Sequence, residues 1–206
     1  LKLTYDKYLE QFKSAGSAEA ARLAEFAMKD QLKSGVQTIQ YQINTLMTTN
    51  GQSPFVTLFL ELDPKDEFLD YTAMIIEEIL KQRYEGIKNE FGVAVTPAFP
   101  KLVYVLDEFN SLKGGKYDYL TKLAVKCSAK RMYPDYVSAK KMRENYGAVF
   151  SPMGCRSFLS PWKDASGKEK WDGRFNQGVV SLNLPQIAIC SGGNEEKFWE
   201  LLEERL

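Results

Sequence analysis

The side chains best able to do chemistry in this 206-residue chain are three cysteines, because histidine is absent. Cys155 lies in residues 150–158 (FSPMGCRSF), where a proline and a glycine interrupt regular structure. This pattern predicts a loop between two aromatic residues. Functional residues concentrate on such loops, and the neighbouring Arg156 would favour a thiolate or an anionic ligand. The alternative is a small buried side chain, because free cysteine is among the most buried residue types.

The other two cysteines give weaker indications of function. Cys127 shares a predicted helical face with Leu120 and Leu123, which indicates core packing. Nothing around Cys190 suggests an activated thiol. The three cysteines are separated by 28 and 35 positions, which matches neither a disulfide framework nor a paired-CxxC zinc site. We therefore predict no metal site and expect a reducing, cytoplasmic location.

Two polar segments are further candidates for ligand binding. Asn176 lies in residues 173–178 (GRFNQG), where its amide could bind a carboxylate or a hydroxyl group, or could serve turn formation. Gln52 and Ser53 lie in residues 50–54 (NGQSP), which could offer N–H groups and a hydroxyl to a phosphate. A plain turn between a helix and a strand is the alternative. The GxxxxGK[ST] phosphate loop is absent from the chain.

Hydrophobic periodicity predicts the elements that must position these residues. Residues 164–172 indicate an exposed hairpin or loop, and Asn194 is a plausible N-cap of a last helix. The other predicted elements are a helix over 18–48, a strand over 55–62, a helix from an Asp63-Pro64 N-terminus to Gly86, a strand over 102–106, a helix over 117–132 and a strand over 178–184 that Pro185 stops.

Strands that are apolar on both faces and alternate with helices are typical of an α/β fold with mostly parallel strands and crossover helices. An open sheet and a barrel both fit this pattern. The chain opens at Leu1 without an initiator methionine, and it stops at Leu206 within the last predicted helix. We therefore expect a fragment of a longer protein.

Composition and charge exclude several classes of function. Lysine plus arginine equals aspartate plus glutamate at 27 each, so the basic excess of a dedicated nucleic-acid binder is missing. No apolar run approaches the ~18 residues of a membrane span, and we expect no membrane partner. Without histidine, a Ser-His-Asp or Cys-His site cannot be built from these residues alone.

Five ordered blocks of the sequence resemble the anaerobic (class III) ribonucleoside-triphosphate reductases, a family of glycyl-radical enzymes. The similarity runs from about residue 44 to the C-terminus, and the first 43 residues are similar only as a helical lead-in. The blocks are 50–57 (NGQSPFVT), 99–103 (FPKLV), 130–135 (KRMYPD), 152–159 (PMGCRSFL) and 173–185 (GRFNQGVVSLNLP).

This resemblance implies a ten-stranded α/β barrel with a central finger loop, here near 147–158, and residues 1–206 would form the first part of that catalytic barrel. It implies that Cys155 becomes a thiyl radical and removes the 3′ hydrogen of a ribonucleoside triphosphate. Asn176 would help to position the ribose and formate, which supplies the electrons. Gln52, Ser53 and Arg156 are candidate substrate contacts.

Other parts of such an enzyme have no counterpart in the sequence. The resemblance implies a glycyl radical in a C-terminal region outside this chain, and a zinc site that also lies outside it. It further implies an N-terminal regulatory domain, outside this chain, that binds allosteric nucleotides. The fragment alone would therefore be inactive. It also implies a radical-SAM iron–sulfur activating enzyme as partner, and a homodimer. One alternative is a pyruvate formate-lyase type of glycyl-radical enzyme, which carries two adjacent cysteines, whereas Cys155 lies between Gly154 and Arg156. Another is a non-catalytic nucleotide-binding relative.

Overall fold

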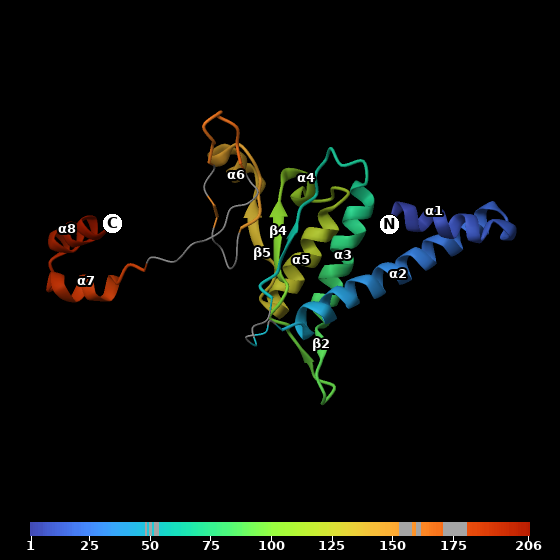
Figure 1. Cartoon of the computed structure of the whole chain (residues 1–206), viewed down its shortest axis with the longest axis horizontal. Helices are drawn as coiled ribbons and strands as arrows, with labels where there is room; N and C mark the ends of the chain where they lie inside the picture. The colour runs from blue at the N-terminus through green and yellow to red at the C-terminus, as the bar shows by residue number, and fades with distance from the viewer. Residues whose placement is uncertain (48, 50, 52–53, 153–157, 160–161, 171–180) are drawn as a thin grey trace. The chain divides into compact units, whose positions relative to one another are not determined.

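A computed structural model describes the chain except for residues 48, 50, 52–53, 153–157, 160–161 and 171–180 (Figure 1). The chain divides into two compact units, Leu1–Ser160 and Pro161–Leu206.

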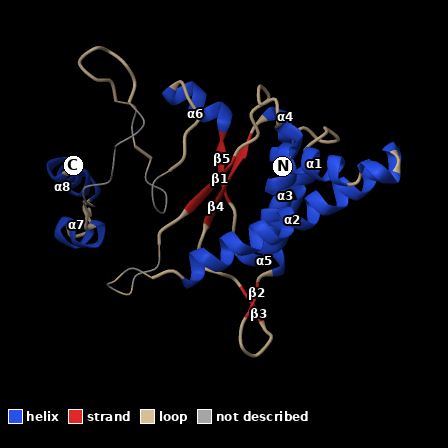
Figure 2. Ribbon diagram, turned by 45° about the vertical axis from the view of Figure 1, so that its right-hand side comes forward, coloured by secondary structure: helices blue, strands red, loops and turns tan. Residues whose placement is uncertain are grey.

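The first unit is built on a parallel sheet of three strands, in the spatial order β1-β4-β5. Helix α3 connects β1 to β4, and helix α5 connects β4 to β5. Because the strand order advances in one direction and such crossovers are right-handed, both helices lie on the same face of the sheet (Figure 2). The predicted α/β class is confirmed, and the ten-stranded barrel stays a prediction. The bounds are Thr57–Leu60 for β1, Leu69–Glu85 for α3, Lys101–Leu106 for β4, Asp118–Arg131 for α5 and Asp135–Ser138 for β5.

The core lies between the sheet and these two helices. Alternate residues of β1 and β4 face the helices, and Leu60, Leu102 and Tyr104 among them are buried. Each fully buried leucine contributes about 2 kcal/mol to stability. The helical residues of the core are Ala73, Ile76, Leu80, Leu120 and Ala124.

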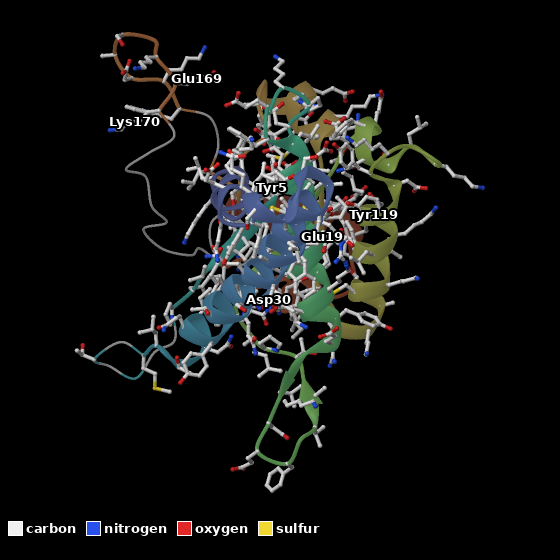
Figure 3. The ribbon with its side chains drawn as sticks, turned by 90° about the vertical axis from the view of Figure 1, so that its right-hand side faces the viewer. Tyr5, Glu19, Asp30, Tyr119, Glu169 and Lys170 are labelled. Atoms are coloured by element: carbon white, nitrogen blue, oxygen red, sulfur yellow. The ribbon has the colours of Figure 1, made fainter. Side chains whose placement is uncertain are left out.

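Figure 3 shows Tyr119 of α5 beside α3. Burial raises the pKa of the Tyr119 hydroxyl to about 12, and the negative charge of Glu77 adds to the shift.

Two N-terminal helices precede the sheet, α1 (Lys2–Gln11) and α2 (Ser17–Thr45), with a short 3-10 turn, η1 (Lys13–Ala15), between them. The predicted helix over 18–48 is confirmed, although it ends at Thr45. α2 packs against both α1 and α3. The Gln40 amide donates to Gln82 Oε1 of α3 at 3.1 Å, and Asn44 Nδ2 donates to the Phe99 carbonyl at 3.0 Å. These bonds fix the C-terminal half of α2 beside the start of β4.

Two buried arginines join the end of α3 to the segments around it. Arg83 donates to the Pro97 and Pro100 carbonyls at 2.8 and 2.5 Å. Arg131, at the end of α5, donates to the Tyr84 and Glu85 carbonyls at 3.0 and 2.5 Å. Between these contacts the chain forms an antiparallel hairpin of β2 (Ile87–Lys88) and β3 (Ala94–Val95).

Gly86 is required where the chain leaves α3. Its φ of +83° lies in the left-handed region, and a Cβ there would lie 2.7 Å from both Arg131 Nη2 and the Val95 carbonyl. The close approach of the arginine therefore depends on the missing side chain.

Two sequence predictions about element boundaries are wrong. Asp63 and Pro64 do not start a helix: Asp63 Oδ1 accepts from the Lys65 N–H at 2.9 Å in a turn, and α3 begins only at Leu69. The strand predicted over 178–184 is absent from its described part, since 181–183 are not strand and helix α7 (Leu184–Ser191) follows. Pro185 occupies the first turn of that helix instead of stopping a strand.

The second unit contains a turn and two helices. An antiparallel bridge joins Lys163 to Glu169, which confirms the predicted exposed hairpin in its described part (Figure 3). α7 packs against α8 (Glu195–Arg205), in which Asn194 Oδ1 accepts from the Lys197 N–H at 3.0 Å. The predicted N-cap is confirmed.

We predict that Arg131→Met lowers the free energy of unfolding by about 2 kcal/mol, because the substitution leaves partly buried carbonyl groups at the end of α3 without their donors. Chemical denaturation followed by circular dichroism measures the change. Lys126→Met, an exposed change on the same helix, is the control and should shift stability by less than about 0.5 kcal/mol. Equal stability of the two variants would contradict this role of Arg131.

Candidate functional site

The sequence-predicted site residues Cys155, Arg156, Asn176, Gln52 and Ser53 all lie outside the described residues. Their proposed roles stay predictions. The structure instead describes the helix that leads to Cys155 and the sheet of the first unit.

The chain approaches Cys155 from helix α6 (Ala139–Tyr146), which follows β5 directly. The helix ends at Gly147 in a left-handed conformation, with its N–H donating to the Arg143 carbonyl at 2.9 Å. Beyond it, the Phe150 ring packs edge-on against Phe158 at 6.2 Å between centroids. The two aromatic residues that flank Cys155 in the sequence therefore contact each other.

Tyr146 extends this aromatic contact into a cluster of Tyr146, Phe150 and Phe158, because its ring lies 5.6 Å from that of Phe150. Pro152 beside the cluster is buried. Aromatic edge-to-face pairs each contribute about 1 kcal/mol beyond the area that they bury. The cluster thus brings Phe150 into contact with Phe158, which follows it by eight positions.

The face of the sheet opposite α3 and α5, called here the second sheet face, carries a different set of side chains. The strand register places Thr57 beside Lys101, and Val103 beside Asp135. Side chains two residues apart along a strand share a face. The second sheet face therefore consists of Thr57, Phe59 and Glu61 from β1 and its end, Lys101, Val103 and Val105 from β4, and Asp135 and Val137 from β5.

The carboxyl end of the second sheet face holds a cluster of charges. Arg143 of α6 forms an ion pair with Asp107 at 2.8 Å. The other oxygen of Asp107 accepts from the Glu108 N–H at 2.7 Å and caps α4 (Glu108–Ser111). Asp107 thus links the end of β4 to the helix that precedes the Cys155 segment. Ligands of α/β proteins commonly bind at this end of a parallel sheet.

Glu61 lies in the same charged cluster. Burial raises the pKa of its carboxyl group, the negative charges of Asp63 and Asp107 raise it further, and the Arg143 guanidinium opposes them. The folded structure therefore disfavours the charged form of Glu61, which lowers the stability of the protein when this carboxyl group is ionised.

The amino end of the second sheet face holds a lysine on an aromatic platform. Lys101 Nζ donates to the Tyr133 hydroxyl, and it lies 4.7 Å from the Tyr133 ring centroid and 5.4 Å from that of Phe99. Phe99 packs edge-on against Phe55 at 4.8 Å, and Phe55 lies two positions after Ser53. Blocks 50–57, 99–103 and 130–135 therefore meet at one end of the sheet.

Sequence reasoning did not select Lys101 or Tyr133 as site residues. The available signal was a lysine at the first position of a buried strand, directly after a Phe-Pro pair. Its contact with Tyr133, 32 positions later, depends on the pairing of β4 with β5 and could not be obtained from spacing.

The two described cysteines differ in environment. Cys127 is fully buried, as predicted, and burial raises the pKa of its thiol to about 11, although Arg83 and Arg131 oppose the shift. Cys190 is exposed on α7. Within the described ranges no three histidine, cysteine, aspartate or glutamate side chains are grouped as metal ligands. In the same ranges no helix is long and apolar enough to cross a membrane.

A cleft of about 610 Å³ lies between α2, the end of α3 and β2. Its lining includes Lys33, Tyr41, Gln82 and Lys88.

Comparison with known proteins gives consistent matches. A family model described as anaerobic ribonucleoside-triphosphate reductase matches residues 4–206. The protein of that name from Enterobacteria phage T4 is 41% identical over 214 aligned residues, which cover 100% of this chain and 34% of the phage protein. The Escherichia coli (strain K12) protein is 43% identical over 171 residues, covering 82% and 23%. The Haemophilus influenzae protein is 38% identical over 207 residues, covering 100% and 28%. The chain thus spans about a third or less of the length of these relatives.

We predict that Glu61→Gln raises the free energy of unfolding at pH 7. The folded-state pKa of Glu61 is raised above its ordinary value of 4.5, so the folded protein binds this proton more tightly than the unfolded chain does. Stability from this group is therefore present below about pH 4 and is lost as the pH rises through the folded-state pKa. The gain from the amide should accordingly disappear on acidification, as measured by denaturation at pH 7 and pH 4. Glu90→Gln, in the exposed hairpin turn, controls for the lost charge. A gain that is equal at both pH values would contradict the electrostatic explanation.

We also predict that iodoacetamide modifies Cys190 but not Cys127 in the folded protein. At pH 8 a thiol with a pKa of about 11 is ionised in about one molecule in a thousand, and Cys127 is in addition fully buried. Peptide mass spectrometry before and after denaturation measures the labelling. Modification of Cys127 at the rate of Cys190 without denaturant would show that the α5 core opens.

Proposed function

Because this chain belongs to the family of anaerobic ribonucleoside-triphosphate reductases, we propose that it forms part of an enzyme that reduces ribonucleoside triphosphates to deoxyribonucleoside triphosphates. The match of the family model over residues 4–206 carries this proposal. Since the relatives are about three times as long or longer, we assign to this chain the first part of the catalytic barrel with its finger loop near 147–158.

In this proposal Cys155 is the catalytic residue. A glycyl radical outside this chain supplies the unpaired electron by taking the hydrogen atom of the Cys155 thiol. The Cys155 sulfur then takes the hydrogen atom from C3′ of the ribose, and the 2′ hydroxyl leaves as water after it gains a proton. Formate gives two electrons and its hydrogen and leaves as carbon dioxide, and Cys155 returns the hydrogen atom to C3′. The sum is one ribonucleotide, formate and a proton converted to deoxyribonucleotide, water and carbon dioxide.

Asn176 positions formate and the ribose in this scheme, and Gln52, Ser53 and Arg156 are proposed substrate contacts. Thiyl chemistry needs a site from which water is excluded, because reactive intermediates are otherwise lost to side reactions. Two described features support such a site: the aromatic cluster at the base of the Cys155 segment and the nearly inaccessible Val103 and Val105 on the second sheet face.

The proposal extends to partners that other parts of the protein would bind. These are a radical-SAM iron–sulfur activating enzyme, a second copy in a homodimer, zinc, and allosteric nucleotides. We place the reaction in the cytoplasm, in keeping with three cysteines that form no recognisable disulfide pattern.

We predict that Cys155→Ser in the full-length, anaerobically activated protein keeps the glycyl radical and abolishes deoxynucleotide formation with formate. A serine hydroxyl holds its hydrogen atom too strongly to pass the radical on to the substrate. Electron paramagnetic resonance measures the radical, and chromatography measures the product.

Cys190→Ser is the matched control, because it makes the same change at an exposed thiol and should leave both readouts unchanged. Undiminished product formation by Cys155→Ser would mean that the radical reaches the substrate by another residue. Absence of deoxynucleotide formation by the activated wild type would overturn the proposed function.

A further inference from the structure

The charge of Lys101 is incompletely compensated by the described part of the protein. None of the ion pairs among the described residues includes Lys101. Its one described hydrogen-bond acceptor is the Tyr133 hydroxyl, so two of the three ammonium N–H groups have no described protein acceptor. The side chain is partly buried, between the rings of Tyr133 and Phe99. Aromatic faces stabilise an ammonium group but supply no oxygen to accept these hydrogens.

The surroundings of Lys101 add positive charge. The Arg83 guanidinium lies 5.8 Å from the Tyr133 ring centroid, and burial lowers its pKa without neutralising it. Arg83 donates to backbone carbonyls and, like Lys101, is absent from the described ion pairs. Two cations therefore flank the Tyr133 ring. Fixed charges of one sign in a partly buried site attract a ligand of the opposite sign.

The position of Lys101 suits a reactant of the proposed reaction. Lys101 begins β4 on the second sheet face, next to Thr57 in the strand register and opposite the face that α3 and α5 cover. In a barrel with its helices outside, this face is the inner one. The residues before Phe55, which contacts Phe99 beside Lys101, include the proposed substrate contacts Gln52 and Ser53.

We propose that Lys101 is an oxyanion-binding residue that contacts a reactant of the reductase, with Tyr133 holding its ammonium group in place. The inference rests on the proposed function and adds to it the residue that neutralises the negative charge of the reactant. The oxyanion is a phosphate of the ribonucleoside triphosphate or the carboxylate of formate. Both accept charge-assisted hydrogen bonds from an ammonium group.

The test compares Lys101→Met and Lys101→Arg with wild type in the full-length activated protein, with KM measured separately for the ribonucleoside triphosphate and for formate. Lys101→Met keeps an apolar chain on the aromatic platform and should raise one of the two KM values by about ten- to a hundredfold, the effect of losing a charge-assisted hydrogen bond. Lys101→Arg keeps the charge and should recover most of the affinity. The KM that rises identifies the oxyanion.

Lys130→Met is the matched control, because the Lys130 ammonium also lies over a ring, 4.1 Å from the Tyr84 centroid, but on the exposed side of α5. It should leave both KM values unchanged. The glycyl-radical content, measured by electron paramagnetic resonance, should be equal in all variants. Both KM values of Lys101→Met within twofold of wild type would overturn the proposal.

A second variant covers a failure of Lys101→Met to fold. Tyr133→Phe keeps the ring and removes only the hydroxyl that holds the ammonium group, so it should raise the same KM by a few-fold, and no change would overturn the proposal. A wild type without turnover would overturn the proposed function separately. In that case calorimetry would measure how tightly the unactivated protein binds the ribonucleoside triphosphate and formate. Weaker binding of either one by Lys101→Met would support the role of Lys101. Unchanged binding of both would overturn it.

Discussion

The handedness of the two parallel crossovers is the constraint on which the rest of the first unit depends. β1, β4 and β5 pair in chain order, so two right-handed connections must place α3 and α5 on one side of the sheet. That side buries Leu60, Leu102 and Tyr104 against the helices. The alternate residues are thereby committed to the second sheet face, where no crossover helix can cover them. A doubly wound sheet would instead reverse direction and cover both faces. The described part thus has the arrangement that a closed α/β barrel requires, in which helices lie outside and a separate set of side chains lies inside.

The two buried arginines, Arg83 and Arg131, hold the segment 86–100 in place between α3 and β4. Helix ends leave carbonyl groups without partners, and a buried guanidinium supplies several donors in one plane. Arg131 serves the end of α3, and Arg83 serves the approach to β4. Hydrogen bonds to carbonyl dipoles compensate each charge in place of a carboxylate, so the positive charge stays near the amino end of the sheet. The same interactions that stabilise the fold therefore also place a positive charge near Lys101.

Local signals were enough to predict the parts of the fold that local energies determine. The apolar runs of β1 and β4, the periodicity of α2 and α5, the core position of Cys127 and the Asn194 cap are all confirmed. The errors arose where two uses of one residue compete. Pro64 lies in a turn and Pro185 in the first turn of a helix, although proline is compatible with either position. For the site, the sequence indicated the loop around Cys155 from its proline, glycine and aromatic residues. It could not indicate the contact of Lys101 with Tyr133, because strand pairing creates that contact.

The charges of the second sheet face are separated along the strands in a way that bears on the proposed chemistry. Lys101 lies at the amino end, and Glu61, whose pKa is raised, lies level with Val105, roughly 13 Å further along β4 at the usual rise per residue. Val103 lies between them, and both Val103 and Val105 are almost inaccessible to solvent. In the proposed function, an anionic reactant would be attracted to the first end and repelled from the second. Asp135, which lies beside Val103 in the strand register, adds a carboxylate to the middle of the face, so an anion would be favoured only at the Lys101 end. With the oxyanion at Lys101, the ribose would lie toward the two buried valines, which exclude water as a radical intermediate requires.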